Sequence, residues 1–278
     1  AMTADPTYRG FALDAETALA LLQWQAEMGA DEPCLDAAID RYDLPDRAEA
    51  PAPRKAAPTS ATASATAAAP RDEAEDLVAR AEALATAAAS LTALAEAQEA
   101  FDGIELRRGA RNFCFADGNP AARVMIVGEA PGEEEDRVGR PFVGRAGQLL
   151  DQMFAAIGLS REAVDAEKAL YITNVLPWRP PGNRRPEPAE IAMMLPFLRR
   201  HIELAQPDML VLMGNTPCAA LLNQQGILKL RGTWASAFGL PALPMTHPAY
   251  LLRTPLAKRE AWADLLSLSA RLDGGKAP

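Results

Sequence analysis

The chain has 278 residues, 49% of them apolar, and a formal net charge of −9. This length allows one large domain, or one domain with an appended segment, and no apolar run approaches the ~20 residues of a membrane span. The start of the chain lacks the basic residues and apolar stretch of a secretory signal. Its three cysteines, Cys34, Cys114 and Cys218, are too few and too scattered for a disulfide framework, so we expect a reducing cytoplasm.

The acidic excess lies in the first part of the chain. Residues 1–100 carry 18 Asp and Glu against 7 Lys and Arg, whereas residues 101–278 carry 19 against 21. The second part is therefore nearly neutral, and its arginines gather in the expected loops. This distribution is compatible with a surface that binds phosphates.

The first hundred residues predict three segments. Residues 1–43 are expected to be helical, because residues 13–30 have the apolar spacing of an amphipathic helix. Residues 44–71 are mainly Ala, Pro, Thr and Ser, which bury too little to offset the entropy of ordering, so they predict a disordered linker. Residues 72–100 are rich in Ala, Leu and Glu and predict a helical extension packed on the main domain at residues 101–272.

Strands and helices alternate along the main domain. Short apolar runs predict four strands, and longer runs with helical spacing separate them. This alternation implies an α/β fold with a four-stranded parallel sheet covered on both faces. The strands are expected at residues 122–128, 169–176, 208–214 and 242–247, and the helices at residues 144–159, 188–205, 216–224 and 258–272.

The unusual residues of the chain follow these strands, at the sheet edge where ligands of such folds bind. Asn174 is an amide at the end of a buried strand and needs hydrogen-bond partners there. It can offer a donor and an acceptor side by side, which matches the edge of a nucleobase, although an Asn that ties down its own loop is the alternative. The stiff stretch "PWRPPGNR" follows it.

Three further residues are candidates with plain alternatives. Phe142 lies in "GRPFVGRAG", which could hold an aromatic ring at a helix start or bury it in the core. His247 follows the fourth strand in "THPAYLLR". The other histidine, His201, lies on a helix and is expected to be a surface or packing residue. The turn "GEAPGEEED" lacks the glycine spacing of a nucleotide-binding loop.

Five motifs in order resemble the uracil-DNA glycosylase superfamily, and most closely its family 4. They are "GEAPGEEED", "GRPFVGRAGQLLD", "YITNVLPWRPPGNR", "LRGTW" and "HPAYLLR", within residues 101–270. The resemblance implies a three-layer α/β/α sandwich. It also implies an enzyme that flips uracil out of DNA and hydrolyses its N-glycosidic bond, leaving an abasic site for base excision repair.

By this resemblance, Phe142 would stack on the flipped base, Asn174 would bind its pairing edge, and His247 would bind the O2 oxygen as charge develops. The remaining roles follow the same motifs. Matching positions line the uracil pocket, act in catalysis or bind DNA: Ala130 and Glu135 in the pocket; Glu129 and Asn183 with His247 in catalysis; Arg145, Arg184, Tyr250, Leu251, Leu252 and Arg253 at DNA. Ala130 replaces an Asp of the best-known uracil glycosylases, which puts a direct general base in doubt.

Family 4 members usually bind a [4Fe–4S] cluster through four cysteines. The matching positions here are Phe101, Ile104, Trp178 and Met194, none of them a thiol. We therefore expect no metal and no cofactor, with these apolar side chains filling the space of the cluster.

Two other interpretations remain open. One is a non-catalytic or covalent uracil-DNA binding protein of the same fold, but the basic stretch "GILKLRGTW" contains no histidine that could trap DNA. The other is a base- or nucleotide-processing enzyme, which "HPAYLLR" does not favour. We expect a monofunctional hydrolase that acts on uracil-containing DNA as a monomer, away from membranes.

Overall fold

The computed structural model describes residues 7–8, 11–12 and 70–274. The chain divides into two units, residues 1–64 and 65–278. Of the first unit, only strands β1 (Thr7–Tyr8) and β2 (Phe11–Ala12) are described, and they pair antiparallel. The helix expected at residues 13–30 and nearly all of the expected linker lie outside the described residues. Helix α2 begins at Pro70, two residues before the expected start of the helical extension at residue 72.

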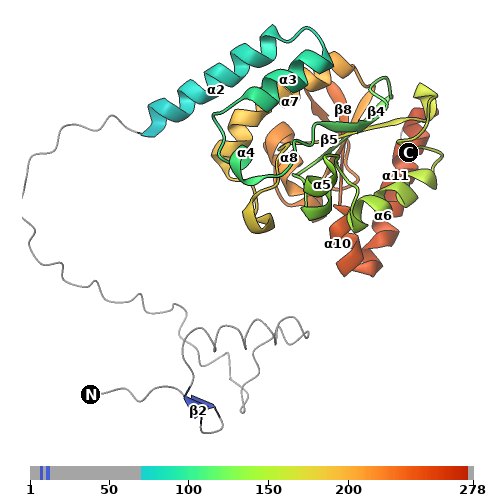
Figure 1. The fold of residues 1–278 in the computed structure, drawn as a ribbon. Coiled ribbons are helices and arrows are strands. Elements are labelled where there is room, and N and C mark those ends of the chain that lie inside the picture. Colours follow the sequence, from blue (N-terminus) through green and yellow to red (C-terminus); the bar gives the residue numbers. More distant parts are fainter. Residues whose placement is uncertain (1–6, 9–10, 13–69, 275–278) are drawn as a thin grey trace, which may run out of the picture. The chain divides into compact units, whose positions relative to one another are not determined.

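A mixed sheet of six strands forms the centre of the second unit (Figure 1). The four predicted strands are its inner strands, and all of them run parallel. Two short antiparallel strands, which the sequence did not predict, extend the edges. In the order β3-β5-β4-β6-β8-β7, the strands are Ala116–Gly118, Leu170–Asn174, Val124–Gly128, Met209–Met213, Leu240–Met245 and Ala235–Ala237.

The expected four-stranded sheet is thus the parallel core of a wider one. Strands β3 ("ADG") and β7 ("ASA") have three residues each and contain no β-branched or aromatic residue. A segment of that length and composition carries no readable period. Pairing with the neighbouring strand, rather than local propensity, makes it extended.

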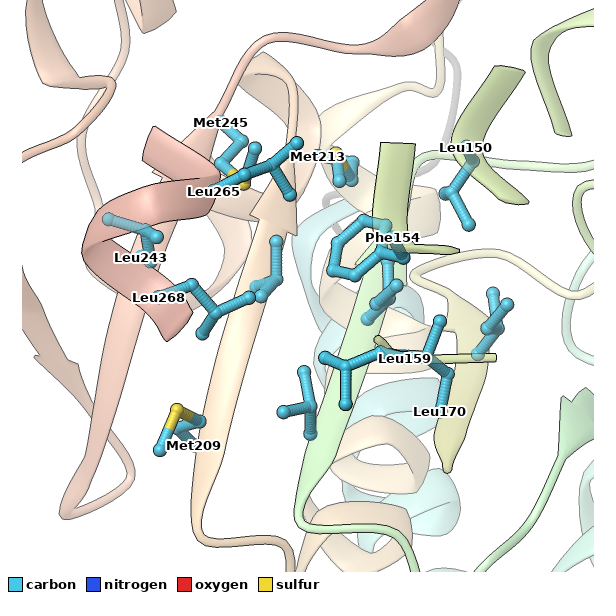
Figure 2. Packing of buried hydrophobic residues seen from close by; sticks show 14 of the residues in the cluster. Leu150, Phe154, Leu159, Leu170, Met209, Met213, Leu243, Met245, Leu265 and Leu268 are labelled. Atoms are coloured by element: carbon cyan, nitrogen blue, oxygen red, sulfur yellow. The ribbon is translucent and has the colours of Figure 1, made fainter. Parts of the chain in front are cut away.

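Helices cover both faces of the sheet, which confirms the three-layer α/β/α class. Val124 and Ile126 of β4 pack toward α6 (Arg145–Ala155) and α11 (Lys258–Leu272). Figure 2 shows this layer, in which Leu150 and Phe154 of α6 and Leu265 and Leu268 of α11 belong to one cluster over the strands. The alternate residues Met125 and Val127 pack on the opposite face, toward α7 (Pro188–Ala205) and α8 (Asn215–Leu222).

The helical extension packs on the outer side of α7. It forms two helices, α2 (Pro70–Ala87) and α3 (Leu91–Ala100), rather than one continuous run. The break comes at Ser90, whose hydroxyl caps α3 by accepting a hydrogen bond from the Ala93 N–H at 3.1 Å.

A third apolar cluster lies between the extension, α7 and the loop after β5. The four residues at the expected iron–sulfur positions, Phe101, Ile104, Trp178 and Met194, all belong to it, each at most 2% exposed. The Phe101 ring meets Phe197 edge-on at 5.6 Å. These side chains therefore fill the region as a packed core.

Short helices and turns complete the unit. They are α4 (Leu106–Gly109), α5 (Glu133–Val138), α9 (Ile227–Leu230), α10 (Pro248–Arg253) and the 3-10 turns at Ala166–Lys168, Pro181–Asn183 and Pro255–Ala257. The "LRGTW" motif fastens α11, because Arg231 pairs with buried Asp264 and the Trp234 indole donates to Ser267 at 3.0 Å. Within the described ranges, no helix has the length and apolar character needed to cross a membrane.

Replacing Trp178 by Ala tests the third cluster. Trp178 is 2% exposed and its ring lies 5.3 Å from that of Phe113. We expect the free energy of unfolding to fall by ~3–5 kcal/mol, because the cavity cannot collapse fully. Trp262→Ala is the control, since Trp262 is 43% exposed and its loss should cost about 1 kcal/mol or less. Equal losses in urea unfolding would mean that the cluster contributes no special stability.

Candidate functional site

The candidate site lies at the carboxyl edge of the parallel strands. In the β4–β5 ladder, Gly128 is paired with Asn174, so the ends of both strands stand side by side. The Gly214 N–H donates to the carbonyl of Met245 at 2.9 Å, which brings the end of β6 beside β8 and the following His247. The parallel register therefore gathers these strand-end residues, as the sequence predicted.

Phe142 has an unusual backbone conformation. Its φ angle is +54°, a region that non-glycine residues rarely occupy and that costs ~1–3 kcal/mol. The side chain is only 5% exposed, and the ring stacks on the His247 imidazole with centroids 5.4 Å apart and planes inclined by 28°. Phe142 is therefore both buried and part of the site.

Gly128 makes room for this ring. A Cβ atom at Gly128 would lie 2.5 Å from the Phe142 ring and 2.3 Å from Asn174 Oδ1. No side chain fits at that position without displacing one of them. The absence of a Cβ thus lets an aromatic ring and an amide meet at the end of β4.

Asn174 is 6% exposed, and its Oδ1 is buried without a hydrogen-bond partner among the described residues. A buried acceptor left unpaired costs ~1–3 kcal/mol. The alternative was an amide that holds its own loop. In the described part of the chain, Asn174 Oδ1 makes no such hydrogen bond. The atom is suited to accept a hydrogen bond from the N–H of a planar ligand lying on Phe142.

The His247 imidazole is held in its neutral form. Burial, and then the nearby charge of Arg253, lower its pKa from 6.5 to about 4. Its Nδ1 accepts a hydrogen bond from the Ala249 N–H at 3.1 Å, where His247 caps α10. Because Nδ1 accepts, the proton belongs on Nε2. His247 therefore presents an N–H donor without a positive charge.

Glu135, which was expected in the uracil pocket, bonds to backbone N–H groups of the neighbouring loops. Its Oε1 accepts hydrogen bonds from Val143 N–H at 2.9 Å and Gly144 N–H at 2.8 Å, and its Oε2 accepts from Gly132 N–H at 3.1 Å. These bonds join the loop after β4 to the segment that carries Phe142. The carboxylate thus fixes the two loops relative to each other through their backbone N–H groups.

The other predicted catalytic residues have different surroundings. Glu129 is partly buried, and its carboxylate accepts a hydrogen bond from the Thr216 hydroxyl at the start of α8. Ala130 packs against the third apolar cluster. Asn183 is exposed, and its Oδ1 accepts a hydrogen bond from Arg179 Nε at 2.8 Å.

The residues expected at DNA divide into two groups. Arg145, Leu252 and Arg253 are exposed and Tyr250 is partly exposed, so these four can reach a ligand surface. Leu251 is fully buried, because it faces inward from α10. Arg184 donates to both oxygens of Glu190 at 2.9 and 2.6 Å, which fastens the loop to α7. The expectation of a DNA contact is therefore corrected for Leu251, whereas Arg184 is exposed and its DNA contact stays a prediction.

Sequence reasoning did not single out Thr216 or Arg161. Thr216 holds Glu129, and Arg161 donates to the backbone carbonyls of Pro141 and Phe142. Each lies far along the chain from the residue it holds and in no motif of its own. No spacing rule would have identified them.

Comparisons with known proteins agree with this geometry. Residues 115–266 match the uracil DNA glycosylase superfamily. The chain is 43% identical over 147 residues to a type-4 uracil-DNA glycosylase of Thermotoga maritima, covering 51% of this chain and 72% of that protein. A type-4 enzyme of Archaeoglobus fulgidus is 35% identical over 185 residues, 63% of this chain and 88% of its own length. The chain belongs to the uracil-DNA glycosylase superfamily, and its likeness is to the type-4 branch.

The two histidines predict a pH-dependent stability. Burial lowers the pKa of His201 to about 3, and that of His247 is about 4. Below about pH 6.5 the unfolded chain binds protons that the folded chain does not, so stability falls with pH by up to ~1.4 kcal/mol per unit for each histidine. The loss continues until the folded pKa is reached.

Urea unfolding at pH 7, 6 and 5 measures this slope. His201 stacks on Phe115 at 4.2 Å and its Nε2 lies 2.8 Å from the Tyr171 hydroxyl. His201→Phe keeps the stacking and removes the titrating group. The free energy of unfolding should then change less with pH, by up to ~1.4 kcal/mol per pH unit, the contribution of one histidine. An unchanged slope would show that His201 titrates normally in the folded protein.

Proposed function

We propose that this protein excises uracil from DNA by hydrolysing the N-glycosidic bond, as a monofunctional glycosylase of base excision repair. The observation that carries the proposal is the buried Asn174 Oδ1, which has no partner among the described residues, beside the Phe142 ring and the neutral His247 imidazole. An amide, an aromatic platform and a donor at one edge suit a flipped, planar base. The names of the type-4 relatives support the same activity.

Recognition would rest on Asn174. Uracil offers an N3–H donor beside the O4 acceptor, so the amide oxygen would accept from N3 while the amide nitrogen donates to O4. Cytosine reverses both groups, which would leave the buried amide unpaired and so discriminate strongly against it. The base must leave the duplex to be read in this way, at a cost of a few kcal/mol.

His247 would act on the departing base. Cleavage leaves negative charge on uracil, and the Nε2–H of His247 would donate to the O2 oxygen as that charge grows. One well-placed donor of this kind is worth ~10²–10³ in rate. A neutral donor suits the role because the pKa lowered to about 4 keeps the imidazole uncharged at neutral pH.

Glu129 would orient the attacking water. Its carboxylate is already fixed by the Thr216 hydroxyl, which leaves its other oxygen for a water molecule. Ala130 offers no base, and the Asn183 amide oxygen is bonded to Arg179, so Glu129 is the stronger of the expected catalytic partners. Positioning of water, rather than strong base catalysis, suits a bond whose cleavage is driven by the leaving base.

Contact with DNA would be made by the exposed tip of α10 and the first turn of α6. Leu252 is 37% exposed, and Arg253 is exposed next to it. Leu252 would fill the space left by the flipped base, with Arg253 and Arg145 at the phosphates. We infer that the protein acts as a monomer in the cytoplasm, because one chain supplies all these residues and its cysteines suit a reducing compartment.

The type-4 likeness implies an iron–sulfur cluster, but the residues present do not fit one. The four matching positions form a packed apolar core. Burial raises the pKa of both the Cys114 and the Cys218 thiol to about 12, so neither is a ready thiolate. In the described part of the chain, no group of three or more potential metal ligands comes together. We propose that catalysis uses no metal.

Uracil excision is tested with labelled oligonucleotides under single-turnover conditions, without added metal. We expect wild-type protein to yield alkali-labile sites at uracil, and His247→Ala to slow the chemical step by ~10²-fold or more. His201→Ala is the matched control, because His201 is buried away from the site against Phe115 and Tyr171. Intact uracil-DNA at stoichiometric protein would reject the enzyme, and a stable protein–DNA adduct on a denaturing gel would favour covalent capture.

Iron content provides an independent test. Protein purified anaerobically should be colourless and contain much less than one iron per chain, with full excision activity. Brown protein with stoichiometric iron, losing activity when the iron is chelated, would contradict the metal-free proposal. This outcome would leave the assignment of Asn174 and His247 untouched, so the two proposals can fail separately.

A further inference from the structure

Arg161 is a buried arginine that belongs to none of the motifs at the site. Its side chain is only 6% exposed. Its guanidinium donates to the carbonyl of Pro141 at 3.0 Å and to that of Phe142 at 2.8 Å. It also donates to Asp117 at 2.9 Å and to Asp151 at 2.8 Å. One side chain therefore connects the backbone under the Phe142 ring to two other elements.

Those two elements are rigid parts of the fold. Asp117 lies on the edge strand β3, and Asp151 lies on α6. Arg161 itself comes from the segment between α6 and β5. The two carboxylates face two cations, because Arg140 lies 3.7 Å from Asp117 in addition to Arg161. The guanidinium thus ties the 141–142 backbone to β3 and α6 through a planar fork, which a point charge cannot reproduce.

The segment it holds needs support. The Phe142 φ angle is +54°, and α6 passes so close that a Cβ at Gly147 would lie 1.8 Å from the Phe142 carbonyl oxygen. Glu135 binds the N–H groups of the next two residues. A cation therefore holds the carbonyls at residues 141–142, and an anion holds the N–H groups at residues 143–144.

We propose that Arg161 is a positioning residue of the glycosylase, which keeps the Phe142 ring at the height and tilt that a flipped uracil needs. The inference rests on the proposed function. Without the guanidinium, two buried carbonyls lose their donors and Phe142 is free to relax toward negative φ. The ring would then leave its stack on His247 and its place beside Asn174. A displacement of about 1 Å at such a site can cost ~10² in rate.

Arg161→Met and Arg161→Lys test the proposal. Arg161→Met removes every hydrogen bond, so we expect the single-turnover excision rate to fall by ~10²-fold and the inhibition constant of free uracil to rise by about tenfold or more. Arg161→Lys keeps the charge without the fork and should lie between Met and wild type. The affinity for uracil-free duplex should stay within about twofold, because Arg161 is buried and touches no exposed DNA-facing residue.

Arg123→Met is the matched control. Arg123 makes a comparable network with Asp208 at 2.6 Å, Glu167 at 2.7 Å and the Leu272 carbonyl, but it precedes β4 at the opposite end of the strand. Its loss should lower the melting temperature without changing the inhibition by uracil. All rates are measured at least about 10 °C below the lowest melting temperature of the set.

NMR spectra of the protein without substrate test the position of the Phe142 ring independently of activity. The Phe142 ring lies over the His247 imidazole, so its ring current shifts the imidazole proton resonances in NMR spectra. Arg161→Met, or Arg161→Lys if the Met variant does not fold, should move these resonances, and Arg123→Met should not.

Unchanged His247 resonances would overturn the role of Arg161, as would an excision rate and uracil inhibition within threefold of wild type. Equal effects of Arg161→Met and Arg123→Met would do the same, because they would mean general loosening. Wild-type protein that leaves uracil-DNA intact would instead reject the proposed function.

Discussion

The close approach of three chain segments at Gly128 is the constraint on which the site depends. The parallel pairing of β4 with β5 sets Gly128 opposite Asn174, and the missing Cβ leaves room for the Phe142 ring against both. A single methyl group at this position would separate the amide from the aromatic platform. The candidate site is thus a direct consequence of strand register and of one residue without a side chain.

Three unfavourable features gather at this edge of the sheet. Phe142 has a positive φ angle, Asn174 Oδ1 has no hydrogen-bond partner in the described part of the chain, and burial holds His247 neutral. Each costs stability, and each persists because the apolar layers on both sheet faces overdetermine the surrounding backbone. Such a concentration of local costs is typical of a preformed binding site, where the same groups become satisfied by a ligand.

The third apolar cluster contains apolar side chains at the positions where the family resemblance would place metal ligands. The four positions that the resemblance matches to cluster ligands lie in the segment before residue 106, in the loop after β5 and on helix α7. Here apolar side chains at those positions meet in one core, where Gln98 also donates to Met194 Sδ at 3.7 Å. Dispersion and burial do not require fixed ligand geometry, so packed side chains can support the loop that carries Asn183.

The sequence by itself determined the order and type of the main elements and the sheet edge at which the candidate site lies. Short apolar runs and helical periods are local properties, so the four inner strands and helix α7 at residues 188–205 could be predicted. Glycine, amide and histidine after those strands marked the site edge for the same reason. Only the tertiary structure decided which polar atoms are already paired. Glu135, Arg184 and Asn183 are occupied by partners, Leu251 faces the core, and Arg161 reaches Phe142 from a distant segment. Hydrogen bonds between residues far apart in sequence depend on how the layers of the fold pack. A local sequence pattern does not determine which of these side chains come within bonding distance.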